Sequence, residues 1–374
     1  MIRILGIETS CDETALALVT KGGAGELSVE KNEVLSQIII HKEYGGVVPE
    51  VAARKHLEAI FPMLEHEISN EGEGIDAICV TAGPGLPPAL RIGVEVAKTL
   101  SWLWQKPLIP VSHMEGHIYA NWLMEGIKPG FPCLALIVSG GHTELILMRD
   151  HGKFERLGET IDDAAGEAFD KAAHMLGLPY PGGSNIAKLA ECGNPHAYDF
   201  PRALLKDPNL NFSFAGLKTS LLYFLRKHES EITNEKFRKD VAASYQEAIV
   251  EVLIKKTARA VAQYRPKSAI LAGGVAANTI LRQRFLKEIG EFNKLPVSIP
   301  PMAYATDNAA MIAAAGCFRF GNEANYTNPL ILFANPNLDL TVDVASSFAP
   351  SVFAKATTDK LELRQDKGNV PTAI

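Results

Sequence analysis

Apolar runs separated by polar turns give the first half of the chain a regular order. An apolar run at 2–7, a polar turn at 8–14 and a second apolar run at 15–19 predict a β-hairpin with a polar tip. An apolar strand at 75–80 then precedes a glycine turn and an amphipathic helix, together at 83–104. A strand, a glycine turn and a helix in this order aim the N–H groups of the helix N-terminus at an anion.

The same order of elements recurs in the second half. Residues 131–138 form an apolar run, 139–143 a polar tip and 144–148 a returning run. The apolar strand at 268–272 continues into a glycine turn and a helix that extends to Ile289. Because a whole supersecondary order repeats, the sequence predicts two related α/β lobes that face each other across a nucleotide cleft.

This repeat also divides the chain into regions. A length of 374 residues is enough for two compact domains. We expect lobe I at 1–130, with part of 308–340 packing back on it, and lobe II at 131–307, with a helical insertion at about 160–240. The apolar pattern is lost beyond 340, so a poorly ordered tail is expected at 341–374.

Two long helices are predicted from apolar spacing alone. The first follows Pro49 and extends to about Ile68, with Pro62 expected to end or kink it, and the second occupies 237–264. The residues expected to face inward are Val51, Leu57, Ile60, Leu64 and Ile68 in the first helix and Val241, Tyr245, Ile249, Val252 and Val261 in the second.

Net charge restricts how the chain can contact nucleic acid. A formal charge of -6 argues against a protein that grips a polyanion with its whole surface, so such a role must be local or shared with a partner. The best local candidate is one basic stretch, although its interspersed acids fit an ordinary charged surface equally well. Its basic residues are Lys218, Arg226, Lys227, Lys236, Arg238 and Lys239.

Cysteine usage and the N-terminus indicate the compartment. The five cysteines are scattered and form no C-x-x-C pair, which is typical of reduced thiols in the cytosol. No charged leader precedes an apolar region at the N-terminus, and no apolar run has the length of a membrane span. We therefore expect a cytoplasmic protein with no membrane partner.

The stretch from Val111 to His117 carries the clearest candidate chemistry. In a helix, the four-residue spacing of His113 and His117 places both imidazoles on one face, where they can hold one divalent metal. Asp307, at the expected start of an Ala-rich helix, is the best third ligand. A pair of structural histidines explains the same spacing equally well.

Two groups of acids are open to more than one interpretation. The carboxylates in the first hairpin tip, Glu8, Asp12 and Glu13, suit a metal or water contact better than a bare anion, and a plain surface turn is the alternative. A second group recurs at helical spacing, which favours a solvated acidic face. Its members are Asp163, Glu167 and Asp170.

A series of motifs, taken in order, resembles the universal tRNA threonylcarbamoyladenosine transferase family, called TsaD in bacteria and formerly described as an O-sialoglycoprotein endopeptidase. The resemblance covers about residues 2 to 336. The motifs that carry it are Glu8 to Thr14, Tyr44 to Glu50, Gly83 to Leu86, His113 to His117, Ser139 to Thr143, Asp162 to Lys171, Tyr180 to Gly183, Phe212 to Lys218, Gly273 to Asn278 and Thr306 to Met311.

This resemblance implies an acyltransferase with the actin-like ATPase (ASKHA) fold, in which two RNase H-like lobes surround a nucleotide and metal cleft. The implied reaction moves the threonylcarbamoyl group from L-threonylcarbamoyladenylate to N6 of adenosine 37, next to the anticodon, in tRNAs that read codons beginning with A. The implied cofactor is one divalent metal, Fe²⁺ in most descriptions with Zn²⁺ as the alternative. A TsaB-like paralogue and a TsaE-like ATPase are the implied protein partners.

The family's site residues carry over onto matching positions of this chain. His113, His117 and Asp307 are the implied metal ligands. A mixed carbamic–phosphoric anhydride needs carbonyl polarisation, a well-placed leaving phosphate and exclusion of water more than a protein nucleophile, so none is assigned. At Pro88 the chain departs from the family pattern, and a backbone contact there is expected to be altered. The implied adenylate contacts are Ile137, Val138, Ser139, Gly140, Gly141, Asp170, Gly183 and Asn278, with Gly273 and Gly274 close by.

Three other classes of protein compete with this family. A zinc metalloprotease helix needs its glutamate directly after the first histidine, whereas Glu115 stands two residues on. A sugar or acetate kinase of the same fold rarely needs a His pair beside the phosphate, and direct phosphoryl transfer to a small substrate would identify it. A nucleotide-dependent scaffold of chaperone or actin type would hydrolyse ATP regardless of the metal residues.

Overall fold

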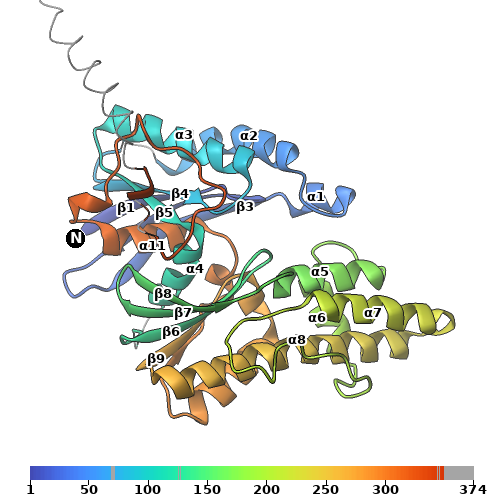
Figure 1. The fold of residues 1–374 in the computed structure, drawn as a ribbon. Coiled ribbons are helices and arrows are strands. Elements are labelled where there is room, and N and C mark those ends of the chain that lie inside the picture. Colours follow the sequence, from blue (N-terminus) through green and yellow to red (C-terminus); the bar gives the residue numbers. More distant parts are fainter. Residues whose placement is uncertain (69–71, 125, 127, 343, 345, 349–374) are drawn as a thin grey trace, which may run out of the picture.

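The computed structural model arranges the chain as two lobes, each built on a five-stranded sheet (Figure 1). It describes residues 1–374 except 69–71, 125, 127, 343, 345 and 349–374. Lobe I contains β1 (Ile2–Glu8), β2 (Glu13–Lys21), β3 (Leu27–Ser36), α1 (Ile38–Tyr44), α2 (Pro49–Glu67), β4 (Ala77–Gly83), α3 (Pro87–Trp104), β5 (Leu108–Ser112), α4 (His113–Tyr119) and α11 (Ala309–Arg319). Lobe II contains β6 (Cys133–Val138), β7 (Thr143–Asp150), β8 (Lys153–Glu159), α5 (Ala165–Met175), α6 (Gly182–Ala190), α7 (Ala215–Lys227), α8 (Glu235–Tyr264), β9 (Ser268–Ala272), α9 (Thr279–Arg284), β10 (Val297–Ser298) and α10 (Met302–Ala305).

Both sheets have the same strand order, as the repeated pattern predicts. The order is β3-β2-β1-β4-β5 in lobe I and, read in the equivalent direction, β8-β7-β6-β9-β10 in lobe II. In each sheet the first three strands form an antiparallel meander and the last two run parallel to the central strand. The prediction of two related α/β lobes is therefore confirmed.

Helices α4 and α11 form a layer between the two sheets. In Figure 1, α2 and α3 lie on the outer face of the first sheet, and α11 and α4 lie on its inner face, toward lobe II. Helix α11 packs on β1, β2 and β4, and α4 packs on β5 of lobe I and on β6 and β9 of lobe II. Their shared core includes Val111, Ile137 and Met311. Side chains carried by this layer are thus held by both lobes.

Small residues let α11 sit directly on the first sheet. A Cβ added to Gly6 in β1 would lie 2.3 Å from the Ala309 carbonyl oxygen. A Cβ added to Gly316 in α11 would lie 2.0 Å from the Cys79 Sγ atom. Since neither approach leaves room for a side chain, the start of α11 and the loop before it are closely positioned on lobe I.

The two helices predicted from apolar spacing correspond to α2 and α8. All the predicted inward residues of α8 are buried. Helix α2 continues through Pro62 instead of ending there. Leu57 is 52% exposed, so the prediction that it faces inward is wrong, and Phe61 beside it is exposed as well. The outer side of α2 is therefore partly apolar.

The C-terminal segment differs from the tail that the sequence predicts at 341–374. Val344 and Phe348 are buried in the core of lobe I. Asp339 forms a bidentate ion pair with Arg156 of β8, with N–O distances of 3.0 and 3.1 Å. The segment up to Phe348 therefore packs on lobe I and also contacts lobe II. The remainder of the predicted tail, 349–374, lies outside the described residues.

In the described part of the chain, no helix combines the length and the apolar character that a membrane span requires. All five cysteines are unpaired, and Cys79, Cys133 and Cys317 are buried as small core residues.

An aromatic cluster surrounds His151, which lies in the turn between β7 and β8. Its ring stacks on Phe318 with the ring centroids 4.0 Å apart. Its Nδ1 atom lies 3.1 Å from the hydroxyl oxygen of Tyr119. Burial lowers the pKa of His151 to about 4, so the folded protein keeps this ring uncharged at neutral pH.

Acidification from pH 6.5 toward about 4 is expected to destabilise the protein through His151. The unfolded chain protonates this residue at its ordinary pKa of 6.5, whereas the folded protein does so only at about 4. Since the unfolded state binds more protons in this window, the free energy of unfolding falls as the pH falls. The variant His151→Phe is expected to reduce that loss, measured as the urea midpoint above and below pH 6.5.

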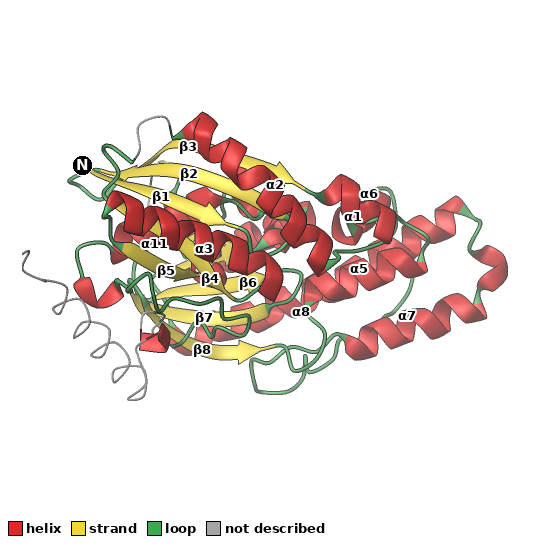
Figure 2. Cartoon of the chain, turned by 90° about the horizontal axis from the view of Figure 1, so that it is seen from above, coloured by secondary structure: helices red, strands yellow, loops and turns green. Residues whose placement is uncertain are grey.

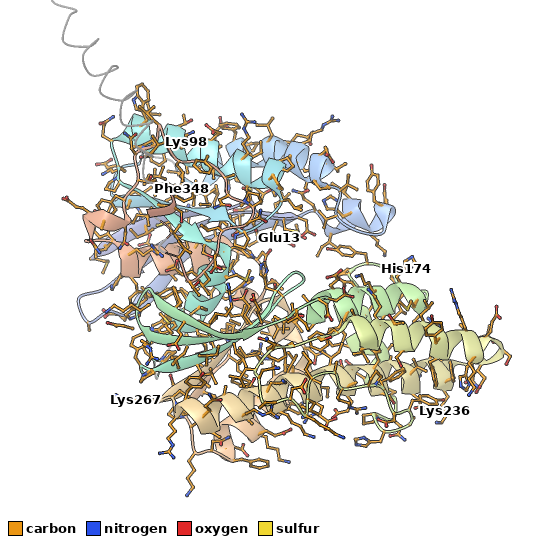
Figure 3. The ribbon with its side chains drawn as sticks, viewed as in Figure 1. Glu13, Lys98, His174, Lys236, Lys267 and Phe348 are labelled. Atoms are coloured by element: carbon orange, nitrogen blue, oxygen red, sulfur yellow. The ribbon has the colours of Figure 1, made fainter. Side chains whose placement is uncertain are left out.

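The control for this experiment is His174→Phe, at an exposed position of α5 (Figure 3). It is expected to leave the pH dependence as in the wild type. If His151→Phe also showed the wild-type pH dependence, His151 would not be a source of the acid sensitivity.

Candidate metal centre and adenylate site

Two histidines enter the site on α4. Strand β5 is buried along its whole length and ends at Ser112, and α4 begins at the next residue. The rings of His113 and His117 are one helical turn apart, with centroids separated by 4.6 Å. The two residues are 7% and 1% exposed. The predicted placement of both imidazoles on one helix face is confirmed.

Asp307 joins them from the loop before α11. Asn308 caps that helix by accepting the Met311 N–H at 3.1 Å, and this cap fixes the end of the loop. The Oδ1 atom of Asp307 lies 3.5 Å from His113 Nε2 and 3.2 Å from His117 Nε2. One ligand atom from each residue lies within 4.8 Å of the other two. The structure thus brings the three predicted ligands together.

The three residues fit a divalent metal ion. Both ring nitrogens of His117 are buried and, among the described residues, neither makes a well-aligned hydrogen bond; Asp307 Oδ1 lies 3.2 Å from Nε2. A buried polar atom that is poorly satisfied costs up to about 1–3 kcal/mol, and a metal on Nε2 would reduce that cost. Burial lowers the pKa of His117, which favours the neutral ring that a metal requires. Imidazole and carboxylate together are a common donor set for Fe²⁺ and Zn²⁺.

Opposite charges stabilise Asp307 and His113 against each other. Burial acts to raise the pKa of Asp307, but His113, with His117, holds that pKa well below its ordinary value. Burial acts to lower the pKa of His113, but Asp307 and then Glu8 hold it well above its ordinary value. The carboxylate of Asp307 is therefore ionised, which is the form that binds a metal.

Carboxylates of the first hairpin tip adjoin this group. Glu8 is fully buried, and its Oε2 atom lies 3.0 Å from His113 Nδ1. Glu13 lies at the edge of lobe I that faces lobe II (Figure 3). Burial, followed by Asp307 and Asp12, raises the pKa of Glu13 to about 10. Because Glu8 and Asp12 are both buried, this tip is not a plain surface turn.

The predicted adenylate contacts fall in three places, the first of which is the tip after β6. Ile137 and Val138 are fully buried at the end of β6. Both pair with β7, and Ile137 also pairs with β9, so they anchor the tip in the sheet. Gly140 and Gly141 are exposed at the tip itself. A Cβ on Gly166 would lie 2.4 Å from the Ser139 carbonyl oxygen, so α5 starts directly against this loop.

The second place is the junction of α5 and α6. The Oδ1 atom of Asp170 accepts the N–H of Gly183 at 3.1 Å, which joins the two helices. Asp163 and Glu167 instead share Lys171, at 3.2 and 2.5 Å. The prediction of one solvated acidic face is wrong, because Asp170 turns toward α6.

The third place is a cavity of about 430 Å³ in lobe II, which Asn278 lines. The Oδ1 atom of Asn278 accepts the Leu281 N–H at 3.0 Å, and its Nδ2 atom donates to Gln246 Oε1 at 2.7 Å. Gln246 also lines the cavity. Sequence reasoning missed this residue, because on the long buried helix α8 it shows no signal beyond its position.

A second cavity, of about 410 Å³, lies between the lobes. It is lined by Gly85 and Met114 of lobe I, by Glu144 and Arg156 of lobe II and by the segment around Asp339. Met114 directly follows the metal candidate His113. The C-terminal segment, which the family resemblance does not cover, therefore borders a cavity next to α4, the helix that carries the two candidate metal-ligating histidines.

The basic stretch predicted as a phosphate contact is largely paired within lobe II. Arg238 donates a hydrogen bond to the Leu176 carbonyl at 2.7 Å. Such pairing favours the alternative of an ordinary charged surface over a dedicated phosphate site. The ion pairs are Lys218 with Asp163 at 2.8 Å, Lys236 with Asp240 at 2.7 Å and Lys239 with Glu235 at 2.6 Å.

Two lobes with equivalent sheets, with helices α4 and α11 between them, have the architecture of the ASKHA fold class. The structure of T. kodakarensis HypF shares this fold, with a TM-score of 0.57 and 13% sequence identity, over 87% of this chain and 49% of that chain. Full-length HypF in its phosphate- and nucleotide-bound form gives a TM-score of 0.54 and 13% identity, over 85% of this chain and 46% of that one. This chain spans about half the length of these proteins, and the likeness shows the fold alone.

Closer relatives identify the family within that class. Residues 28–314 match the family model of TsaD, the tRNA N6-adenosine threonylcarbamoyltransferase. A relative of that name from Bacillus subtilis (strain 168) is 50% identical over 341 residues, which is 90% of this chain and 96% of the relative. Another from Carboxydothermus hydrogenoformans is 51% identical over 339 residues, 90% of this chain and 97% of the relative. The chain belongs to the TsaD family, and the predicted family, fold and transferase class are confirmed.

Proposed function

We propose that this chain transfers the threonylcarbamoyl group of L-threonylcarbamoyladenylate to N6 of adenosine 37 in tRNAs that read codons beginning with A. The observation that carries the proposal is the group formed by the buried His113 and His117 with the half-buried Asp307, in the layer between the lobes of a TsaD-family chain. A metal-assisted acyl transfer needs such a group beside a site for an activated donor.

The donor is proposed to bind along lobe II. The exposed glycines at Gly140 and Gly141 let a phosphate approach the backbone, with Ser139 beside them. Asp170 and Gly183 follow at the junction of α5 and α6, and Asn278 contacts the nucleoside. The cavity at Asn278, about 430 Å³, has the size of a small-molecule site. Ile137 and Val138 support this loop without touching the donor by their side chains.

We assign the metal to His113, His117 and Asp307, with Fe²⁺ expected and Zn²⁺ as the alternative; when bound, it supplies a Lewis acid. The chain's own residues orient the donor between the lobes and exclude water from it. No covalent intermediate on the protein is proposed. Cys11 lies in the first hairpin tip, but burial, followed by Asp12 and Asp307, raises the pKa of its thiol far above the ordinary value. A thiolate nucleophile is therefore disfavoured there.

We propose that protein partners provide part of the tRNA-binding surface, because a chain with a net charge of -6 is poorly suited to bind a polyanion alone. We place a TsaB-like paralogue on α2 and α3, which lie side by side on the outside of lobe I (Figure 2). A TsaE-like ATPase is the second proposed partner, and the cytoplasm is the proposed location.

The surface proposed for the TsaB-like partner is partly apolar, and exposed apolar side chains are typical of an interface. Those on these two helices are Leu57, Phe61, Trp102 and Leu103, at 52%, 53%, 67% and 61% exposure.

Transfer of labelled threonine into tRNA tests the proposed function. The full chain is supplied with synthesised L-threonylcarbamoyladenylate, the partner proteins and unmodified tRNA. We expect incorporation by the wild type and its loss in His113→Ala/His117→Ala, because that variant removes two of the three proposed metal ligands.

The control variant is His174→Ala, whose side chain is exposed near the end of α5 and is expected to change nothing (Figure 3). Threonine incorporation by the double variant would show that His113 and His117 are not required for the reaction. If folded, metal-loaded wild type gave no incorporation, the kinase and scaffold alternatives would be tested next, by phosphoryl transfer to small substrates and by ATP hydrolysis.

A further inference from the structure

Glu8 is a buried carboxylate whose two oxygens are both anchored. Its Oε1 atom accepts the N–H of Ser10 at 2.5 Å, and its Oε2 atom accepts the Thr81 hydroxyl at 2.6 Å. The residue is 0% exposed. Because these partners belong to the turn after β1 and to β4, the position of the carboxylate is set by lobe I and does not depend on α4.

The anchored carboxylate faces one nitrogen of a proposed metal ligand. His113 Nδ1 lies 3.0 Å from Glu8 Oε2, while His113 Nε2 points toward Asp307. An imidazole binds a metal through a nitrogen without a proton, so the other nitrogen has to keep its proton. Ser10 Oγ is also 3.1 Å from Nδ1, but a hydroxyl can donate or accept and does not decide where the proton lies.

We propose that Glu8 is a positioning residue that holds the Nδ1 proton of His113 and thereby presents Nε2 to the metal. This inference rests on the metal centre of the proposed function. Within the described part of the chain, no group accepts or donates a hydrogen bond at Nδ1 of His117. Of the two histidines, it is therefore His113 whose ring a neighbouring side chain orients. The carboxylate acts through His113 and touches neither donor nor acceptor.

Two substitutions of Glu8 separate this role from a general structural one. In Glu8→Gln, the N–H of Ser10 requires an oxygen opposite it, so the amide nitrogen faces Thr81 and His113. An amide N–H there donates to Nδ1 and moves the ring proton to Nε2, where it opposes metal binding. Glu8→Ala removes the carboxylate but leaves either nitrogen free to carry the proton. Glutamine should therefore impair binding more than alanine, although it resembles glutamate more closely in shape.

The test measures Zn²⁺ affinity of the full metal-free chain by competition with a chelator. We expect about 10–100-fold weaker binding for Glu8→Gln and a smaller loss for Glu8→Ala. Without metal, Glu8→Ala is expected to have a lower melting temperature than Glu8→Gln, so the ranking by stability is the reverse of the ranking by Zn²⁺ affinity. In the Zn²⁺-loaded wild type, ¹⁵N NMR is expected to show a proton on His113 Nδ1.

Two further variants distinguish a specific effect on His113 from a general loss of stability. Thr81→Val keeps Glu8 but removes one of its anchors, and a few-fold weaker Zn²⁺ affinity is expected. Asp76→Asn alters a carboxylate just before β4 that accepts the backbone N–H of Arg3 at 2.8 Å, and wild-type affinity is expected. Wild-type affinity in Glu8→Gln, or affinities that simply follow stability, would overturn the inference. If the wild type bound no Zn²⁺, the metal centre itself would be overturned, and the inference with it.

Discussion

Replacing Arg319 with methionine is expected to lower the free energy of unfolding by about 3–5 kcal/mol. Glu115 is 0% exposed on α4, and the Arg319 guanidinium at the end of α11 holds its carboxylate by contacts of 2.8, 3.1 and 2.8 Å. Without the guanidinium, a charged carboxylate would remain buried between the sheets with its main partner gone. Urea unfolding of the metal-free chain measures the loss.

The double variant Glu115→Leu/Arg319→Met is expected to recover most of that stability. Exchanging both partners of a buried ion pair for apolar residues is often neutral or stabilising, because it removes the desolvation cost of both charges. Arg149→Met is the control: it breaks a solvent-exposed pair with Glu155 and is expected to cost about 1 kcal/mol or less. If the single and double variants were equally unstable, shape and not charge would explain the role of Arg319.

This ion pair bears on the candidate metal centre because it joins the two segments that carry the ligands. His113 and His117 lie on α4, on either side of Glu115 in the sequence, and Asp307 immediately precedes the cap of α11. At Gly116 the helices are in close contact, since a Cβ there would lie 2.6 Å from Ile312 Cδ1. The distance between the histidines and the aspartate is therefore set by helix packing.

Features with a local cause could be predicted from the sequence. The spacing of His113 and His117 places both on one helix face wherever that helix packs. Hairpin tips and glycine turns likewise follow from short stretches of residues, and their repetition predicts two related α/β lobes, which the structure shows as two sheets of the same strand order. Asp307 was reached through its place before an Ala-rich helix and through the family resemblance, and helix packing then explains its position.

Features that depend on contacts between distant elements could not be predicted. The approach of Glu8 to His113, the pairing of Glu115 with Arg319 and the contact of Gln246 with Asn278 each join separate elements. Leu57 was expected to face inward because its spacing fits the apolar stripe, yet this position remains open on the surface. Periodicity gives the face of a helix, but tertiary packing decides how wide the buried part of that face is.

Asp307→Asn is expected to weaken Zn²⁺ binding by more than about 100-fold, since loss of a residue that merely supports a ligand already costs about 10–100-fold. Asp307 is the acidic member of the group, with Oδ1 at 3.5 and 3.2 Å from the two Nε2 atoms. Asparagine has nearly the same shape, so folding is expected to persist. The substitution also removes a charge that raises the pKa of Glu13. Competition with a chelator and metal analysis of the reconstituted protein measure the effect.

The control is Asp240→Asn, which alters a buried carboxylate of lobe II that accepts the Asn194 N–H at 2.8 Å, and wild-type Zn²⁺ affinity is expected. Wild-type affinity in Asp307→Asn would contradict the assignment of Asp307 as a ligand. A metal held by all three residues also joins α4 to the start of α11, and it stabilises the folded state only as far as it binds that state. Zn²⁺ should therefore raise the melting temperature of the wild type and leave that of Asp307→Asn nearly unchanged.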